Sequence, residues 1–583
     1  MFAPYPNVWP ISESSTLIAA VGYPFYKATG SFAFGYDSAY YLACALTGLA
    51  SGLFFRRLVG RGWPALLGTV LFLWCPGRLN NLGTIQTLWA GLNVFPLACL
   101  LRFRRSLAWS DALLGAGGFA AVSLGTLYGG LMGATVIALT APVILWPLRR
   151  RAGPLLRLAA AWGIAGAFTV WFYAPLLAIG RDFEIRASLR NIEGHAADLL
   201  SVLHHGVFSG PLRDLCDRLV PGLPEGSSAL FPTAFLVVAT LLSLALLPRP
   251  EGPGRGSRQP ERRLALWLLL ALVLFSFALG PAPRLAGKVL GLPGPYGLLA
   301  RLPAFSTMRG IHRWDQWFGL AAISGATLLA AGLLVRRRKA ERPWLLAGLA
   351  SLALLDVWPR YVPGQPEPGP SPFQRVLQRT GPDSVVGIYP IRHFLLERAW
   401  VEQLYHGRRL VNGFNSYPPP LHAWLDLLYK DAPPDAVLLV YRELGATAVE
   451  VHLAEVPAAR RAAVETLLAQ LARDGNTVLM SGDRRFVMFR DVLVPQLVAP
   501  SETGGLVFVA GTAVVKTSPG RLIFRLSGSE LPVRVRTAGA SRKDVLSFPL
   551  VAAERMTASL RTAPPPGAVV EREDGTVVGT AQP

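Results

Sequence analysis

The chain has 583 residues, of which 52% are hydrophobic and only 16% are charged, a composition that excludes an ordinary soluble protein of several domains because so much apolar surface needs lipid around it. Its formal net charge of +21 is also found in nucleic-acid-binding proteins. Most of that charge, however, flanks long apolar segments, so we predict membrane lipids as partners and no nucleic acid.

The amino-terminal stretch, residues 1–35, is predicted to be a first extracytoplasmic loop. It contains Pro4, Pro6, Pro10 and Pro24 among scattered polar residues. No positively charged segment followed by an apolar run precedes it, so neither a signal peptide nor a start-transfer helix is visible. We therefore expect that a preceding transmembrane helix is missing from the chain as given.

Residues 36–359 are predicted to form a transmembrane domain of about ten helices. A membrane-spanning helix needs about 20 mostly apolar residues. Runs that approach or meet this length are Tyr36–Phe55, Trp63–Cys75, Thr84–Leu101, Leu158–Ala178, Ala229–Leu247, Leu264–Gly280, Trp317–Val335 and Trp344–Trp358. The run Leu107–Trp146 is about twice as long and is predicted to be two crossings that turn near Ser123–Gly130, where a Gly-Gly pair suits a tight turn.

Basic residues mark alternate connections between these helices as cytoplasmic. Arg and Lys cluster at 56–61, 102–105, 149–157, 249–263 and 336–342, with 20 basic residues against three acidic ones. Short cytoplasmic loops collect basic residues in this way. Both ends of the chain are therefore predicted to lie on the extracytoplasmic side.

After Trp358 the pattern becomes that of soluble domains. Residues 360–495 are predicted to form an extracytoplasmic α/β domain. Its expected helices are Phe373–Arg379 and Pro457–Ala472, and its expected strands are Val385–Tyr389, Ala436–Tyr441, Ala448–His452, Thr477–Met480 and Phe486–Phe489. Residues 496–583 are β-branched with frequent Gly and Pro, which predicts a small β-sandwich-like domain with a loose C-terminus.

Polar residues at the outer membrane boundary are the first candidates for a site, since they are costly there unless they serve a function. The candidates are Glu13 and Asp37, then Arg78, Asn80, Asn81 and Gln86, and then Arg309 and Arg313. On a helix, Arg309 and Arg313 would share a face, and two guanidinium groups side by side can grip a phosphate. The structural alternative is that they reach lipid headgroups or pair with carboxylates such as Asp315.

Signatures of the common soluble enzymes are absent from the sequence. It has no HExxH or other metal-ligand spacing of its eight histidines, no Walker loop, no GxSxG elbow and no paired CxxC. We therefore predict no metal ligands and no cofactor from the residues themselves.

Several segments in a shared order resemble bacterial multispanning GT-C-type glycosyltransferases, including the YfhO-like ones. The matching positions are Tyr5-Pro6 with Ser12-Glu13; Arg78, Gln86, Trp89 and Pro96-Leu97; Leu292-Pro293-Gly294-Pro295-Tyr296 with Pro303, Phe305, Arg309 and Arg313; and His406-Gly407 with Asn412-Gly413 and Pro418. The resemblance covers roughly residues 5–452. It implies a GT-C-like helical fold in the bacterial inner (cytoplasmic) membrane, with the C-terminal domain extracytoplasmic.

The resemblance also implies an activity, transfer of sugar from a polyprenyl-phosphate donor to a lipid, glycan or protein acceptor in the cell envelope. Glu13 would be the catalytic carboxylate, which acts as a general base, orients the acceptor or holds a divalent metal. Arg78, Gln86, Arg309 and Arg313 would bind the donor phosphate and substrate, and Asp37, His406 and Asn412 are further candidates.

Two departures from the family pattern leave other functions open. The family's principal Asp follows a first transmembrane helix that this chain lacks, and Asn80 or Asn81 stands where the family has His. The chain as given is therefore also compatible with an inactive enzyme, with a non-catalytic scaffold of envelope biogenesis, or with a lipid or glycan transporter. A transporter would place polar groups at mid-membrane on broken, repeated helices, a pattern that this sequence lacks.

Overall fold

The computed structural model describes residues 15–60, 62–75, 85–182, 195–203, 259–306, 310–336, 371–382, 384–412, 434–443 and 446–490, short strands between residues 495 and 580, and isolated positions such as 78, 192, 193, 308 and 429. The chain forms two compact units. One comprises residues 13–174 and 185–365, and the other comprises residues 1–12, 175–184 and 366–583.

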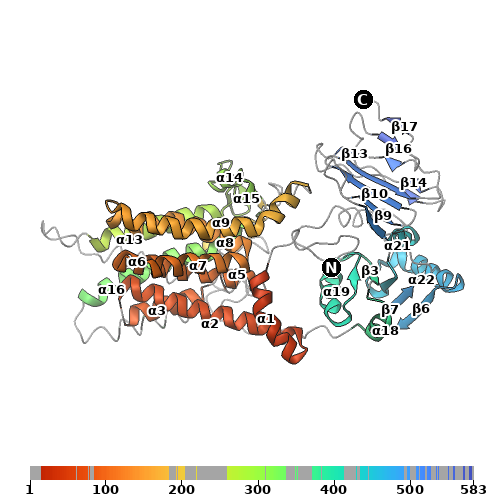
Figure 1. The fold of residues 1–583 in the computed structure, drawn as a ribbon, viewed down its shortest axis with the longest axis horizontal. Coiled ribbons are helices and arrows are strands. Elements are labelled where there is room, and N and C mark those ends of the chain that lie inside the picture. The colour runs from red at the N-terminus through yellow and green to blue at the C-terminus, as the bar shows by residue number, and fades with distance from the viewer. Residues whose placement is uncertain are drawn as a thin grey trace. The chain divides into compact units, whose positions relative to one another are not determined.

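The first unit is a bundle of helices that run alongside one another (Figure 1). Its longer helices are α1 (Thr16–Thr29), α2 (Phe32–Val59), α3 (Trp63–Leu73), α6 (Val94–Ser106), α7 (Trp109–Gly125), α8 (Leu127–Leu145), α9 (Ala152–Asp182), α13 (Gln259–Ala278) and α16 (Asp315–Arg336). Shorter elements are α5 (Ile85–Ala90), η2 (Gly91–Asn93), η3 (Trp146–Leu148), η4 (Leu199–Leu203), α14 (Tyr296–Leu299), α15 (Pro303–Ser306) and η5 (Ile311–Trp314), with a hairpin of β1 (Arg284–Leu285) and β2 (Lys288–Val289).

Several of these helices are apolar enough for a lipid environment, and the chain is a membrane protein. Within the described part, Phe32–Val59, Leu127–Leu148 and Ala152–Ala174 have the length and composition to cross a bilayer, and Trp63–Leu73 and Leu264–Ala278 are shorter apolar helices. The apolar run Leu107–Trp146 is divided into α7 and α8 at Thr126, inside the predicted turn. There the Thr126 hydroxyl accepts a hydrogen bond from the Gly129 N–H at 3.1 Å, which caps α8.

Other parts of the helical prediction differ from the structure or are not described by it. Helix α1 lies within the segment 1–35, for which the sequence predicted only a loop, and it continues past Pro24. The predicted single helix Thr84–Leu101 consists of α5, η2 and α6. The predicted spans Ala229–Leu247 and Trp344–Trp358 fall outside the described residues, so the number of about ten helices stays a prediction.

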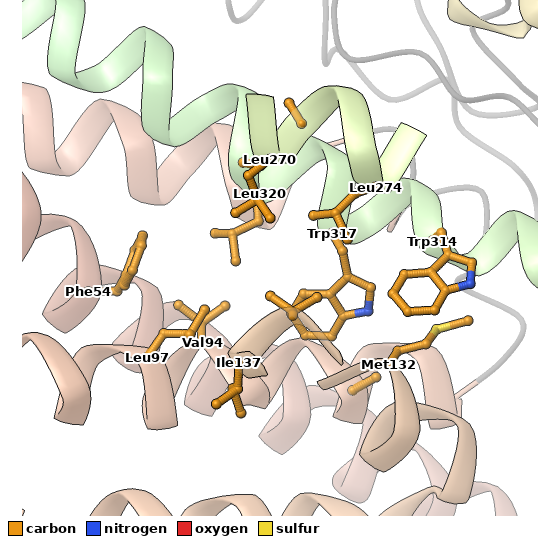
Figure 2. Packing of buried hydrophobic residues seen from close by; sticks show 14 of the residues in the cluster. Phe54, Val94, Leu97, Met132, Ile137, Leu270, Leu274, Trp314, Trp317 and Leu320 are labelled. Atoms are coloured by element: carbon orange, nitrogen blue, oxygen red, sulfur yellow. The ribbon is translucent and has the colours of Figure 1, made fainter. Parts of the chain in front are cut away.

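The core of the bundle joins α2, α6, α8, α13 and α16 through large apolar side chains. Figure 2 shows Phe54, Leu97, Ile137, Leu274 and Trp317 pointing into one packed region. Phe54, Leu97, Leu274 and Trp317 are completely inaccessible. This packing fixes the start of α16 firmly inside the bundle.

The second unit contains a mixed five-stranded sheet in the order β4-β3-β5-β7-β6. Its strands are β3 (Val385–Tyr389), β4 (Arg409–Leu410), β5 (Ala448–His452), β6 (Thr477–Ser481) and β7 (Arg484–Met488). β3 runs parallel to β4 and β5, whereas β7 is antiparallel to β5 and β6. The helices are α18 (Gln374–Arg379), α19 (His393–His406), α21 (Pro434–Glu443) and α22 (Ala458–Arg473), and η6 (Leu453–Glu455) follows β5.

One predicted strand of this domain is wrong. Ala436–Tyr441 lies in helix α21. Val437, Leu438 and Tyr441 are buried at spacings of one and three residues, which is a helical face. A short run that is apolar throughout has no period of its own, so its type is decided by the surrounding packing.

Residues after 495 form antiparallel strands. β8 (Pro495–Val498), β9 (Val507–Ala510), β10 (Ala513–Ser518), β11 (Arg521–Leu526) and β13 (Arg536–Thr537) make one sheet in the order β13-β11-β10-β9-β8. β12 (Val533–Arg534), β16 (Val569–Glu571) and β17 (Val577–Thr580) make another, and β14 (Pro549–Leu550) pairs with β15 (Met556–Thr557). The sandwich packing of these sheets stays a prediction.

Candidate functional site

Arg78 is a cation buried inside the helical bundle. Its side chain is 1% exposed, and its guanidinium carbon lies 5.2 Å from the centre of the Phe72 ring. Among the described residues, none accepts a hydrogen bond from its Nε or Nη1 atom. Gly91 makes room for the side chain, because a Cβ there would lie 1.7 Å from Nη1. A buried cation with open donor positions is expensive in a membrane protein and is a strong candidate for ligand binding.

The antiparallel packing of α3 and α16 brings Cys75, three residues before Arg78, against α16. A Cβ on Gly68 of α3 would lie 2.8 Å from Thr327 Oγ1 of α16. Beyond the end of α3, Cys75 lies against Gly319, whose Cβ would be 3.6 Å from its Sγ atom. The Arg78 N–H donates to the Cys75 carbonyl at 2.9 Å.

Gln316 is a second polar side chain with open hydrogen-bonding positions. It is 1% exposed, and neither its Nε2 nor its Oε1 atom has a partner within the described part of the chain. Its neighbour Asp315, 3% exposed, accepts a hydrogen bond from the Gln316 N–H at 2.5 Å and lies within electrostatic reach of Arg313. The Gln316 amide can donate a hydrogen bond from its NH2 group and accept one at its oxygen. A sugar hydroxyl can both accept and donate, so it can bind to such an amide.

Arg313 and His312 complete the cluster on η5, directly before α16. The Arg313 guanidinium carbon lies 5.4 Å from the centre of the Tyr128 ring. The His312 ring stacks on the His195 ring at 6.1 Å between centroids with an angle of 17°, and its buried Nδ1 atom has no described partner. We group Arg78 with His312, Arg313, Asp315 and Gln316 as the α16 cluster, because Cys75 lies within electrostatic reach of both Arg78 and Asp315. Two guanidinium groups, an amide and an imidazole can hold a phosphate and orient a polar substrate.

A metal centre finds no support in the described residues, where no group of three or more His, Cys, Asp or Glu side chains is placed to hold an ion. A cavity of about 480 Å³ lies at the opposite end of α3 from Arg78. The described residues that line it are Gly52, Arg56, Gly62, Ala65, Leu66 and Thr69, and among these Arg56 alone is charged. We prefer the α16 cluster as the site, because it gathers several polar groups that can act together.

The other predicted site residues of the bundle lie apart from this cluster or are not described. Gln86, on α5, donates from Nε2 to the Ser15 hydroxyl at 3.2 Å. Asp37 is exposed in the first turns of α2. Glu13 and Arg309 fall outside the described residues, as do Asn80 and Asn81. Arg313 lies in η5, which begins at Ile311, and a shared helix face with Arg309 stays a prediction.

His406 and Asn412 belong to the α/β domain, where both serve its fold. His406 ends α19, is 7% exposed and accepts a hydrogen bond at Nδ1 from the Arg408 N–H at 2.9 Å. Asn412 accepts from the Ile388 N–H at 2.9 Å and donates to the Ile388 carbonyl and to the Tyr441 hydroxyl, both at 2.8 Å. The side chain of Asn412 thus extends the pairing at the end of β3.

The α/β domain also contains a buried ionic cluster. Glu450 on β5 and Glu402 on α19 are each 2% exposed, and Arg484 on β7 lies between them. Ser371 donates to Glu450 Oε2 at 3.1 Å, and the His452 ring lies 3.6 Å from Glu450 Oε1. Burial raises the pKa of Glu450 to about 7, and it lowers the pKa of His452 to about 4.

Sequence reasoning found Arg78 and Arg313 but missed His312 and Gln316. Both missed residues stand in the segment Ile311–Gln316 that was inspected for its arginines. The available signal was an uncharged polar residue at the first turn of a predicted span. That signal is weak, because the burial of Gln316 depends on how α16 packs against α3.

Comparison with known proteins gives structural similarities only. No protein-family model and no curated protein sequence matches the chain. Its structure is similar to that of the arabinofuranosyltransferase AftD from Mycobacteria, with 17% identity, a TM-score of 0.46 and coverage of 75% of this chain and 32% of AftD. ArnT from Cupriavidus metallidurans is similar in its apo state, with 15% identity and a TM-score of 0.31, and in complex with undecaprenyl phosphate, with 13% identity and a TM-score of 0.30; both cover 82% of this chain and 87% of ArnT. The chain thus spans about a third of the length of AftD.

Proposed function

We propose that the chain is a membrane glycosyltransferase-like protein of the GT-C type, which transfers a sugar from a polyprenyl-phosphate-linked donor to an extracytoplasmic lipid, glycan or protein acceptor. The observation that carries this proposal is the fully buried guanidinium of Arg78 with its open Nε and Nη1 positions. Phosphate oxygens are the ligand that a guanidinium fork binds best. The ordered sequence resemblance supports the choice of a transferase.

The α16 cluster would act on the leaving group of this reaction. As the bond between the sugar C1 and the phosphate oxygen breaks, the oxygen keeps the electron pair, and Arg78 and Arg313 would neutralise the charge that develops there. Gln316 would hydrogen-bond the sugar or the phosphate through its open amide. These side chains are held by packed helices, so little reorganisation is needed during the reaction.

The acceptor needs a base on the other side of the sugar. Its hydroxyl oxygen bonds to C1 and its proton passes to a carboxylate. Glu13 takes this role in our proposal, because the family resemblance places it there. Asp315 lies two residues after Arg313 in sequence and within its electrostatic reach, and we assign it the orientation of that guanidinium.

Binding of undecaprenyl phosphate by the purified full-length protein tests the carrying observation directly. Native mass spectrometry should show retention of this lipid by the wild type and its loss in Arg78→Gln, a variant of similar length without the charge. Arg150→Gln, at an exposed loop arginine, is the matched control and should bind as the wild type does. Equal binding by Arg78→Gln and the wild type would falsify the assignment of Arg78 to the phosphate.

Transfer activity tests the reaction itself. Membranes with the full-length chain should transfer labelled sugar from a panel of polyprenyl-phosphate-linked pentoses and hexoses, and Glu13→Gln should lower the rate at unchanged lipid binding. If Arg78→Gln loses lipid binding while no donor supports transfer, the chain is a lipid-binding scaffold and not a transferase.

A further inference from the structure

The segment between α13 and α16 combines basic and apolar residues and lacks acidic ones. From Pro281 to Trp314 it contains no Asp or Glu, but it has four Arg and one Lys. It forms the β1–β2 hairpin and α14, followed by α15 and η5. In the view of Figure 1, α14 and α15 lie at the edge of the bundle. We call residues 281–302 the outer platform.

The outer platform exposes a group of large apolar side chains. The exposed fractions are 42% for Leu285, 55% for Val289, 39% for Leu290, 64% for Leu292, 67% for Leu298 and 50% for Leu302. Lys288 and Arg301 are exposed among them. Exposed large apolar side chains interspersed with cations are typical of segments that lie in a membrane interface.

The platform is held rigidly, so these leucines have no route into the protein core. The Asp198 carboxylate accepts hydrogen bonds from the Ala286 N–H at 3.1 Å and from the Gly287 N–H at 2.7 Å, at the turn of the hairpin. Gly294 packs so closely on Gly280 that a Cβ would lie 1.9 Å from the Gly280 carbonyl oxygen. Tyr296 is completely buried and donates to the Phe305 carbonyl at 3.2 Å. The outward direction of the leucines is therefore fixed by the scaffold.

The platform follows α13 in the chain, and this helix also exposes large apolar side chains. Leu266, Leu269 and Leu272 of this helix are 39%, 56% and 62% exposed. The platform begins directly after α13 ends at Ala278, and η5 returns the chain to α16 at Asp315. Since α13 and α16 pack together, their connected ends lie at one boundary of the membrane, and the platform lies at that boundary with them.

We propose that the outer platform is embedded in the adjacent lipid leaflet, with its leucines among the acyl chains and Lys288 and Arg301 on the phosphates of anionic phospholipids. Because the platform has no acidic residues, the negatively charged surface of anionic phospholipids would not repel it. Long basic side chains can reach headgroups while their stems stay in apolar surroundings. This inference is independent of the proposed transferase activity.

Photo-crosslinking in lipid nanodiscs of phosphatidylcholine and phosphatidylglycerol tests the position of the platform. With p-benzoylphenylalanine in place of Leu292, we expect lipid adducts as readily as with the probe in place of Leu269 of α13. The probe in place of Met480, a β6 residue that is 73% exposed, should give no lipid adduct. If the probe in place of Leu292 forms adducts with protein only, or forms no adduct, the proposal is overturned.

A second experiment tests whether the charges of Lys288 and Arg301 bind anionic lipid. In native mass spectra of the full-length protein released from nanodiscs, the variant Lys288→Gln/Arg301→Gln should retain fewer phosphatidylglycerol molecules than the wild type, whereas phosphatidylcholine retention should not change. Arg150→Gln/Arg151→Gln, in a different exposed loop, controls for the lost charge. Unchanged phosphatidylglycerol retention in the platform variant would overturn the assignment of Lys288 and Arg301 to lipid phosphates. The crosslinking experiment tests the position of the platform separately from this charge requirement.

Discussion

Arg484 on β7 donates from Nη1 to Oε1 of Glu450 on the neighbouring strand β5, at 2.9 Å, and the same nitrogen lies 3.2 Å from Oε1 of Glu402 on α19. One guanidinium therefore neutralises two carboxylates that are almost fully buried. Arg398 assists from the surface, with its Nε 2.8 Å from Glu402. The sheet and its covering helix are joined through this cluster.

Replacing Arg484 should destabilise the α/β domain strongly. Arg484→Met leaves Glu402 and Glu450 buried without their common cation, and breaking a buried pair in this way costs about 3–5 kcal/mol. Amide hydrogen exchange of the β5 and β7 peptides in the full-length protein should rise accordingly. Arg485→Met, which removes bonds to backbone carbonyls only, is the matched control and should exchange as the wild type does. Equal protection in both variants would show that the cluster contributes little.

The α/β domain should be most stable near pH 7. Burial lowers the pKa values of His406 and His452 from 6.5 to about 4, so the stability that depends on the neutral rings is lost as the pH falls below 6.5. Burial raises the pKa of Glu450 from 4.5 to about 7, so its contribution has the opposite sign and is lost as the pH rises towards 7. Between pH 4.5 and 6.5 the unfolded state binds a net one proton more, which makes stability rise by about 1.4 kcal/mol per pH unit.

The measurement for this pH profile is hydrogen exchange of the β5 peptide, corrected for the intrinsic exchange rate at each pH. Glu450→Gln should steepen the rise in stability between pH 4.5 and 6.5 to about 2.7 kcal/mol per pH unit, because the two histidines then titrate without the opposing carboxyl group. A profile that is flat between pH 4.5 and 6.5 would contradict the assignment to the two histidines.

Gly91→Ala should disturb Arg78 without touching its charge. The added Cβ would lie 1.7 Å from Nη1, so the guanidinium has to move. We expect a loss of undecaprenyl phosphate binding on the order of tenfold, about 1.4 kcal/mol. Gly163→Ala, on α9 where a Cβ would meet nothing within 4 Å, is the control and should bind normally. Normal binding by both variants would mean that the position of Arg78 is not critical.

Asn412→Ala should unfold the edge of the α/β sheet and leave ligand binding in the bundle unaffected. The substitution leaves the Ile388 N–H buried without its acceptor, at a cost of about 1–3 kcal/mol. The readout is faster hydrogen exchange of β3 with unchanged retention of undecaprenyl phosphate. Gln378→Ala, which removes one exposed bond to the Tyr405 carbonyl, serves as the control. If the variant loses lipid binding while β3 keeps its protection from exchange, Asn412 would instead be a substrate-binding residue.

Strands that are buried from end to end were predictable from the sequence. β3 and β5 have the predicted limits, because all their residues are buried in the centre of the sheet and valine or isoleucine fills three of five positions in β3 and two of five in β5. Helix α21 was not predictable in this way, since an apolar run of six residues suits either element. Helix α1 was hidden by Pro24, which the sequence rules treat as a helix breaker.

The candidate site was predictable only where charge itself was the signal. Arginine in a membrane protein is conspicuous, which is why Arg78 and Arg313 were identified. The depth of Arg78 depends on its packing beside Gly91 and the Phe72 ring, and the burial of Gln316 depends on the packing of α16 in the bundle. Neither can be read from the sequence. The role of Asn412 was likewise invisible, because its partners Ile388 and Tyr441 lie on other elements.

The glycine contacts between α3 and α16 also limit how the protein can move. A Cβ on Gly68 would lie 2.6 Å from Phe55 Cδ1 and 2.8 Å from Thr327 Oγ1, whereas one on Gly319 would make an ordinary contact with Cys75 Sγ at 3.6 Å. Sliding of α16 along α3 that carried a side chain past Gly68 would therefore meet a steric barrier. Close contact at Gly68 thus favours movement of these two helices together over sliding of one along the other.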